Sequence, residues 1–345
     1  MTSTHTPTGA LTPAGSEGTM MRAILHTGYG TVAEDVLRCT TVSRPTPEDD
    51  SVLVRVRASS VDRGTWHIMA GLPYPIRLAG FGVRNPKHLN PGRCLAGTVT
   101  ATGPDVSSFQ VGDEVFGTCD GAFAEYVTAR PDKLSPAPSG LSPEQAASMP
   151  VSGVTALQAV RDHGRVQAGD HVLVVGASGG VGTFAVQIAK AFGAQVTGVC
   201  STAKTGLVRS LGADHVIDHT STDFARGSTH YDVILDIGGN SSLTRLRRAL
   251  TPTGTLVIVG GETDGRLLGG FDRTLRALLL SPFVRQDLRN FVASENGADL
   301  RVLGDLVEAG RLRPVIDRTY PLSEVADAVA HVIGGRARGK TVITI

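Results

Sequence analysis

The chain has 345 residues, of which 41% are hydrophobic and 19% are charged. This balance supports a sizeable buried core and excludes a wholly disordered protein, and the length favours two domains over one. The formal net charge of +1 provides no overall field that would attract nucleic acid or an anionic membrane, so neither is expected as a partner.

Residues 1–19 are mostly Thr, Gly, Pro, Ser and Ala. They have nothing to bury, so we predict a flexible tail over residues 1–19. The 4 cysteines are scattered and include no C-x2-C pair, which argues against a disulfide framework and a structural zinc site. There is no signal-peptide pattern, and no apolar run approaches the ~18 residues of a membrane helix. We therefore expect a cytoplasmic protein.

Two kinds of pattern follow one another along the chain. From Arg22 to about Pro150, short β-rich runs between Gly and Pro residues predict a small β-barrel or sandwich. Beyond Pro143, helices alternate with apolar strands such as H-V-L-V-V and Y-D-V-I-L, which is the pattern of repeated βα units in a parallel sheet. Amphipathic helices follow residue 271, and the closing K-T-V-I-T-I predicts a strand that can return to the first half.

The strongest single motif is a glycine turn. The strand H-V-L-V-V runs into G-A-S-G-G-V-G at residues 176–182 and then into an apolar-periodic helix, which is the order of a dinucleotide site. Gly179 and Gly180 let the backbone approach a pyrophosphate, Gly182 lets the helix pack closely on the strand, and the first N–H groups of the helix hold the anion. A turn that only packs a helix onto a sheet would look similar.

The next strand, Q-V-T-G-V, predicts which nicotinamide cofactor binds. NAD enzymes place an Asp or Glu at the end of this strand to bind the ribose 2'-hydroxyl, but here Cys200, Ser201 and Thr202 follow, with Lys204 just beyond. A hydroxyl and an ammonium can bind a 2'-phosphate, so NADPH is the predicted cofactor. The alternative is an NAD site with a solvated Lys204.

Two other enzyme classes fit less well. G-A-S-G-G also satisfies the G-x-S-x-G nucleophile elbow of α/β-hydrolases, with Ser178 as the nucleophile, but that elbow normally follows several strands of its own sheet. Short-chain dehydrogenases use a Tyr-x3-Lys pair, and none of the 5 tyrosines has a lysine at that spacing.

Several separated stretches match one family in order: A-S-S-V-D-R-G-T-W-H-I-M-A-G at 58–71, P-G-R-C-L-A-G-T-V at 91–99, G-D-E-V-F-G at 112–117 and M-P-V-S-G-V-T-A-L-Q-A at 149–159. With the glycine turn, they make the chain resemble the medium-chain dehydrogenase/reductase superfamily, in its zinc-independent quinone oxidoreductase and enoyl reductase branch. The resemblance implies a GroES-like β-barrel domain (20–150 and 313–345), a Rossmann domain with a doubly wound parallel sheet (151–312), a substrate cleft between them, and a homodimer.

The resemblance also identifies site residues. Zinc-dependent members bind the metal with a Cys, a His-Glu pair and a later Cys or Asp, whereas Asp62 and Arg93-Cys94 occupy the first of these positions here. An arginine has no lone pair for a metal, so no metal is expected. The residues that the resemblance places against NADPH are Thr155, Ser178, Gly179, Gly180, Val181, Ser201, Lys204, His219, Gly260 and Gly261, with Asn240 beside the nicotinamide ribose.

Three side chains are candidates for the substrate pocket: Asp62, where relatives usually have Asn, Trp66, and Tyr74. Trp66 is equally well explained as an ordinary core aromatic. Without a Lewis acid, a simple ketone would lack oxyanion stabilisation, whereas an enone, enoyl group or quinone delocalises the developing charge. We therefore expect hydride transfer from NADPH to a quinone or an α,β-unsaturated carbonyl. The alternatives are a non-catalytic nucleotide-binding interaction protein of this fold, or a zinc-free alcohol or carbonyl reductase.

Overall fold

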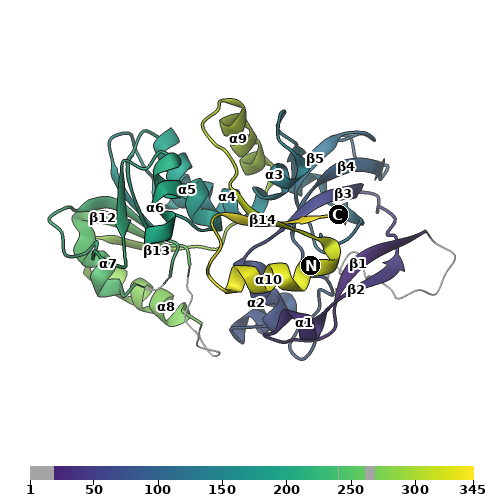
Figure 1. The fold of residues 1–345 in the computed structure, drawn as a ribbon, viewed down its shortest axis with the longest axis horizontal. Coiled ribbons are helices and arrows are strands. Elements are labelled where there is room, and N and C mark those ends of the chain that lie inside the picture. The colour runs from purple at the N-terminus through teal and green to yellow at the C-terminus, as the bar shows by residue number, and fades with distance from the viewer. Residues whose placement is uncertain (1–18, 240, 261–268) are drawn as a thin grey trace.

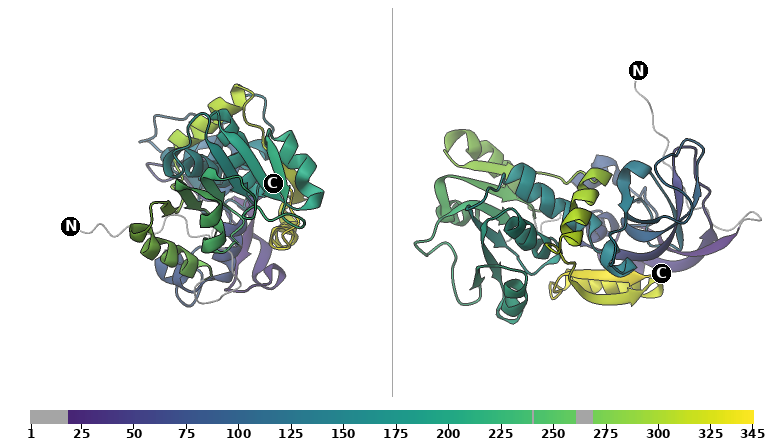
Figure 2. Two further views of the ribbon diagram at one scale, coloured as in Figure 1. Left: turned by 90° about the vertical axis from the view of Figure 1, so that its left-hand side faces the viewer. Right: turned by 90° about the horizontal axis from the view of Figure 1, so that it is seen from above.

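The computed structural model describes residues 19–239, 241–260 and 269–345. A strand-rich first half is followed by a second half of alternating strands and helices, and the last strands return to the first half (Figure 1). The two further views show the same arrangement, with the yellow C-terminal segment lying along the purple and blue N-terminal half (Figure 2). Apart from Thr19, the tail predicted over residues 1–19 is outside the described residues.

The first half is built around a seven-stranded sheet with β3 (Val52–Val61) at its centre. In β3, Val52, Val54 and Val56 are buried while Arg55 and Arg57 are exposed, the period of two expected of a strand with one buried face. The other strands are β4 (Cys94–Thr102), β5 (Glu114–Thr118), β6 (Tyr126–Ala129), β7 (Leu134–Pro136), β14 (Ile316–Pro321) and β15 (Lys340–Thr344).

Smaller elements surround this sheet. β1 (Met20–His26) and β2 (Leu37–Ser43) form an antiparallel ribbon. The helices of this half are α1 (Ala33–Val36), α2 (Arg63–Ala70), α3 (Pro143–Ala147) and α10 (Val325–Ile333), with a π-helical turn at Arg77–Phe81. β15 pairs antiparallel with β3, from Thr341 opposite Val61 to Thr344 opposite Ala58, so the closing strand belongs to this sheet.

The second half contains a six-stranded parallel sheet in the order β10-β9-β8-β11-β12-β13. Along the chain this order is 3-2-1-4-5-6, a doubly wound sheet whose ligands bind at the carboxyl ends of the strands, beside the reversal at β8 and β11. The strands are β8 (His171–Val175), β9 (Gln195–Cys200), β10 (His215–Asp218), β11 (Tyr231–Asp236), β12 (Leu250–Ile258) and β13 (Asp287–Asn290).

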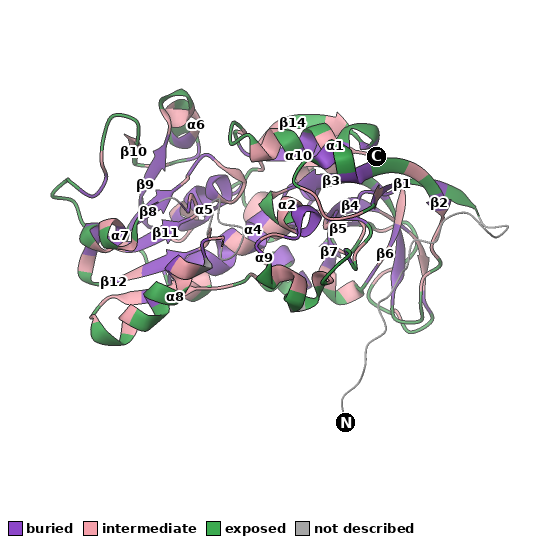
Figure 3. Ribbon diagram, turned by 90° about the horizontal axis from the view of Figure 1, so that it is seen from below, coloured by how far each residue is buried: buried purple, intermediate pink, exposed green. Residues whose placement is uncertain are grey.

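Helices cover the faces of this sheet. They are α4 (Pro150–Gln158), α5 (Gly180–Ala191), α6 (Thr205–Ser210), α7 (Leu243–Ala249), α8 (Phe271–Leu280) and α9 (Gly297–Glu308). Figure 3 shows β8, β9 and β11 as buried strands, in contrast to the exposed outer surfaces of α6 and α7. The predicted fold class, a GroES-like barrel with a Rossmann domain, is confirmed.

The two halves share one hydrophobic core. Phe116 and Val342 from the first sheet belong to the same buried cluster as Val174 and Phe184 from the second. Because this cluster is continuous, the carboxyl edge of the parallel sheet is held against the barrel. The predicted domain boundaries, 150/151 and 312/313, remain predictions.

Candidate functional site

The glycine turn lies between β8 and α5, as its strand-turn-helix order predicts. Gly176 has a φ of +86°, in the left-handed region that favours glycine. Its N–H and that of Ala177 both donate to the carbonyl of Val199 on β9, at 3.1 and 3.0 Å. A Cβ on Gly182 would lie 2.1 Å from the carbonyl oxygen of Gly176, so only glycine allows α5 to approach the turn this closely.

The start of α5 has the properties of an anion site. Gly179 is the N-cap and supplies no side-chain cap, and the first turn contains no acidic residue. The first N–H groups of a helix have no partner within it and carry a partial positive charge. Ser178 is buried and Gly179, Gly180 and Val181 are half-buried around this end. A pyrophosphate therefore fits here on backbone geometry and charge.

Two cations, Lys204 and Arg338, lie at the end of β9. Ser201 is half-buried, and Lys204 Nζ donates to the carbonyls of Gly335 and Ala337, at 3.3 and 2.9 Å. Burial lowers the pKa of Lys204. Asp317 opposes this decrease, and the nearby Arg338 adds to it. An anion near Lys204 would offset both the burial and the repulsion from Arg338.

A carboxylate lies at this end of the sheet, at the end of β10 and not of β9. Asp218 ends β10, and its Oδ2 accepts a hydrogen bond from Thr202 Oγ1 at 2.5 Å. This bond, with those from Thr220, lowers the pKa of Asp218. His219 is exposed, and its backbone N–H donates to Cys200 O at 3.0 Å. Ser201, Lys204 and His219 thus come together at the ends of two adjacent strands.

The ends of β11 and β12 are held by a buried ion pair. Arg273 on α8 donates to Asp236 Oδ2 at 2.5 Å and to the carbonyl of Gly260 at 2.5 Å. Burial raises the pKa of Asp236, and Arg273 opposes that increase. A Cβ on Gly260 would lie 2.2 Å from Ile237 O, so the two strand ends are in close contact. The predicted Asn240 and Gly261 lie outside the described residues.

Two further predicted site residues, Thr155 and Asp62, lie on elements outside the parallel sheet. Thr155 is half-buried on α4, and its hydroxyl donates to Val151 O at 2.7 Å. Asp62 caps α2, because its Oδ1 accepts from Thr65 N at 3.3 Å, while its Oδ2 is buried without a hydrogen-bond partner. An unsatisfied buried carboxylate oxygen is costly, so Oδ2 is a candidate to bind a ligand.

The two aromatic pocket candidates lie in different surroundings. Trp66 is half-buried and packs against a core cluster of the first half, and its Nε1 donates to Thr31 O at 3.4 Å. Its two interpretations, a pocket wall and an ordinary core aromatic, both stay predictions. Tyr74 is 43% exposed. The Arg77 guanidinium lies 5.0 Å from the centre of its ring and 4.2 Å from that of Tyr29.

The positions that carry a metal in zinc enzymes are used differently here. Arg93 pairs with Asp120 at 2.9 Å and with Glu295 at 2.5 Å. Burial raises the pKa of the Cys94 thiol to about 11, with Lys340 opposing this increase and Asp62 adding to it. Among the residues that the structure describes, no group of three or more His, Cys, Asp and Glu side chains is placed to hold a metal ion.

Comparison with known proteins identifies the family. The family model described as "Alcohol dehydrogenase GroES-like domain" matches residues 48–139, and that described as "Zinc-binding dehydrogenase" matches residues 211–343. The mouse protein named "NAD(P)H oxidoreductase RTN4IP1, mitochondrial" is 35% identical over 336 residues, which cover 86% of this chain and 82% of the relative. The chain is a medium-chain dehydrogenase/reductase.

Other relatives place this dehydrogenase/reductase in the quinone oxidoreductase-like branch. The structure of the quinone oxidoreductase from Coxiella burnetii has a TM-score of 0.80 and 29% identity, and the match covers 95% of this chain and 100% of that one. The tomato (Solanum lycopersicum) 2-methylene-furan-3-one reductase is 31% identical over 339 residues, 94% of this chain and 79% of the relative. The predicted superfamily and branch are confirmed, and the chain is an NAD(P)H-dependent oxidoreductase.

The predicted cytoplasmic location is wrong. The mouse relative, which matches most of the chain, is named as a mitochondrial protein. Composition and the lack of a secretory pattern do not separate compartments that hold similar folded enzymes, which is why this prediction failed. Over the described residues, no helix of the dehydrogenase/reductase has both the length and the apolar character needed to cross a bilayer.

Sequence reasoning missed several polar residues at the site of this dehydrogenase/reductase. They are Ser152, Asp218, Asp236, Arg273, Arg338 and Lys340. Asp218 and Asp236 each end a strand at the carboxyl edge of the parallel sheet, and that position could have indicated both. For the others, no local pattern predicts the partner, since the groups that meet lie far apart in the sequence.

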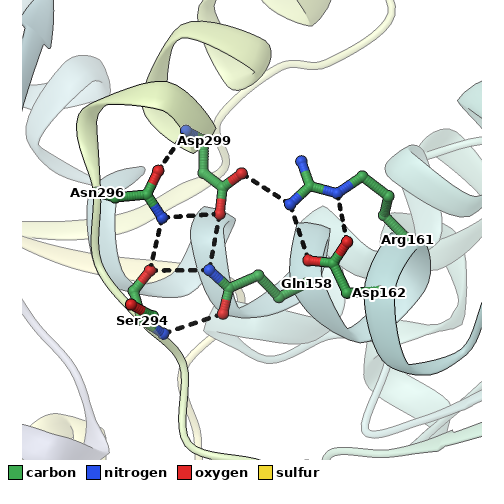
Figure 4. A network of polar contacts seen from close by, with 6 residues as sticks. All are labelled: Gln158, Arg161, Asp162, Ser294, Asn296 and Asp299. Carbon is green, nitrogen blue, oxygen red and sulfur yellow. Dashed lines mark hydrogen bonds and ion pairs between the residues drawn. The ribbon is translucent and has the colours of Figure 1, made fainter.

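A polar network holds α4 of the dehydrogenase/reductase in place (Figure 4). The carboxylate of Asp299 accepts hydrogen bonds from Gln158 at 2.7 Å and Asn296 at 3.0 Å, and pairs with Arg161 at 2.8 Å. Burial would raise the pKa of Asp299, but these partners lower it further than burial raises it. Because Gln158 ends α4, the network fixes the helix that carries Thr155.

Proposed function

We propose that this dehydrogenase/reductase uses NADPH, without zinc, to reduce a quinone or an α,β-unsaturated carbonyl compound. The observation that carries the proposal is the ion pairing of Arg93 with Asp120 and Glu295. The guanidinium stands where zinc-dependent members place an imidazole ligand, and it can offer no lone pair. A conjugated acceptor needs the least help from a Lewis acid, because its developing charge is delocalised.

The preference for NADPH rests on the end of β9. Ser201 and the Lys204 ammonium would bind the 2'-phosphate, and an ammonium has three donors, of which two go to Gly335 and Ala337. His219 would border the adenosine. Asp218 speaks for the unphosphorylated cofactor, because its carboxylate could accept from a ribose hydroxyl.

The chain's own residues would then position the reactants. Backbone N–H groups of Gly180 and Val181 would hold the pyrophosphate at α5. The Gly179 N–H donates to Gly176 O at 3.1 Å, so Gly179 would border the pyrophosphate, and Thr155 and Gly260 would border the nicotinamide half. When bound, the reduced cofactor supplies the hydride. Asp62 Oδ2, buried and without a partner, would accept a hydrogen bond from a donor group of the bound cofactor or substrate.

Reductase assays with and without chelator test this proposal. We expect NADPH oxidation with quinones and enones that is unchanged by EDTA, and a calorimetric dissociation constant lower for NADPH than for NADH. Loss of turnover with EDTA that zinc restores would contradict zinc independence. Reduction of simple ketones alone would favour a carbonyl reductase, and binding without turnover on any acceptor would favour an interaction protein.

We also propose that the protein is a homodimer that associates through the edge of the parallel sheet. β13 is the last strand in the sheet order, and an edge strand can pair with another chain. Beside it, Leu279 on α8 is 64% exposed and Phe283 is 85% exposed, an unusual amount of apolar surface for a monomer.

A further inference from the structure

Lys340 is a charged residue in the interior of the protein. It is 1% exposed and opens β15. Its Nζ donates to Ser152 Oγ at 3.0 Å, and across residues 19–239, 241–260 and 269–345 no carboxylate forms an ion pair with it. A buried ammonium with one neutral partner is costly, because it has lost its hydration without gaining a counter-charge.

The side chain lies against the start of α5. A Cβ on Gly180 would be 3.2 Å from Lys340 Cδ and 3.5 Å from Ser152 Oγ. The preceding residue is attached to the glycine turn, because Gly339 N donates to Ser178 O at 3.0 Å. The Lys340 ammonium and the positive end of α5 are therefore neighbours, and neither has an anionic partner among the described side chains.

Asp62 is not the missing anionic partner of the Lys340 ammonium. Both Asp62 and Lys340 influence the Cys94 thiol, so both lie near it. Yet Asp62 Oδ1 accepts from Thr65 N, and its Oδ2 has no hydrogen-bond partner. The local excess of positive charge is thus left for a ligand.

We propose that Lys340 is a cofactor-positioning residue whose buried ammonium holds the pyrophosphate at the start of α5, with Ser152 orienting the ammonium. This inference rests on the proposed function only in requiring a cofactor that contains a pyrophosphate. The free protein then carries an uncompensated charge that lowers its stability, and cofactor binding compensates it.

The test is Lys340→Met, which keeps the chain length of the side chain and removes its charge. We expect the cofactor-free variant to unfold about 2–4 °C higher, because the buried charge is gone. Calorimetry should show NADPH and ADP-ribose each binding about 10- to 100-fold more weakly. Adenosine 2'-monophosphate, which lacks the pyrophosphate, should bind as it does to the wild type. Ser152→Ala, which keeps the charge, should weaken ADP-ribose binding less.

Unchanged ADP-ribose affinity in Lys340→Met would overturn the proposal, and so would an equal loss for adenosine 2'-monophosphate. If Lys340→Met does not fold, Lys340→Gln is measured with the same ligands, and retained ADP-ribose affinity again overturns it. Failure of the proposed function looks different: the wild type would prefer NADH or leave enones and quinones unreduced, while Lys340→Met would still lose affinity for ADP-ribose.

Discussion

At the scale of single residues, the choice between the two nicotinamide cofactors depends on a small number of charges. Lys204 and Arg338 lie together at the end of β9, while Asp218 lies at the end of the neighbouring strand. Asp218 is already occupied by hydrogen bonds from Thr202 and Thr220. The Lys204 ammonium keeps one N–H beyond its bonds to Gly335 and Ala337. The interaction of that N–H with an incoming 2'-phosphate would be charge-assisted.

Placing a carboxylate where NAD enzymes have one should reverse this preference. We expect Ser201→Asp to weaken NADPH binding by at least about tenfold through repulsion of the 2'-phosphate, with NADH affinity retained. Ser210→Asp adds the same charge at the far end of α6 and serves as the control. Calorimetric titrations of both variants check this. Equal losses for the two cofactors would show that Ser201 does not lie at the phosphate.

At the scale of elements, local patterns predicted the parts of the site that consist of backbone. The strand, glycine turn and helix around residues 171–191 were predictable, because each depends on neighbours within a few residues. The pairing of Lys340 with Ser152, or of Arg273 with Asp236, was not predictable, because 188 and 37 residues separate the partners. Such contacts require the tertiary arrangement, which one sequence does not provide.

The α4 helix shows how an element is held by polar contacts from a distant segment. Asp299, in the first turn of α9, accepts a hydrogen bond from Gln158 and forms an ion pair with Arg161 (Figure 4). A buried carboxylate with several donors contributes stability only while it is ionised. The position of α4, and of Thr155 on it, thus depends on a group from a distant segment of the chain.

Asp299→Asn should lower the free energy of unfolding by about 1–3 kcal/mol at pH 7, because charge-assisted hydrogen bonds are lost. The folded pKa is lowered, so the ionised group stabilises the protein above the ordinary Asp value of about 3.9. This contribution is lost as the pH falls through the lower folded value. Urea unfolding at pH 7 and at pH values near and below 4 checks both points.

The matched control for this variant is Asp305→Asn, an exposed position on the same helix. It should change the free energy of unfolding by less than about 0.5 kcal/mol. If the two variants unfold at the same urea concentration at pH 7, the network of Figure 4 does not stabilise the fold.

At the scale of the whole molecule, one group of exposed apolar side chains lies beside the edge strand β13. The α8 helix and the segment after it expose Leu275, Leu278, Leu279 and Phe283 beside β13. Since soluble monomers rarely expose such a group of residues together, association of two copies is the simplest way to bury them.

Sedimentation analysis tests this association directly. We expect the wild type to sediment as a dimer and Phe283→Glu to shift it toward the monomer, because a charge would be buried in the interface. Val111→Glu, an equally drastic change at a 65% exposed position of the first half, should leave the dimer intact. A wild type that is monomeric at every concentration would contradict the proposed association.

The attachment of β15 beside the glycine turn affects the order in which the molecule is completed during synthesis. All six strands of the parallel sheet precede residue 291, yet Gly339 and Lys340 contact Ser178 and Ser152 from the other end of the chain. A nascent chain that has left the ribosome only as far as α9 can form the sheet but lacks the lysine beneath its turn. Cofactor binding that uses Lys340, as proposed above, therefore requires that the chain as far as β15 has emerged from the exit tunnel.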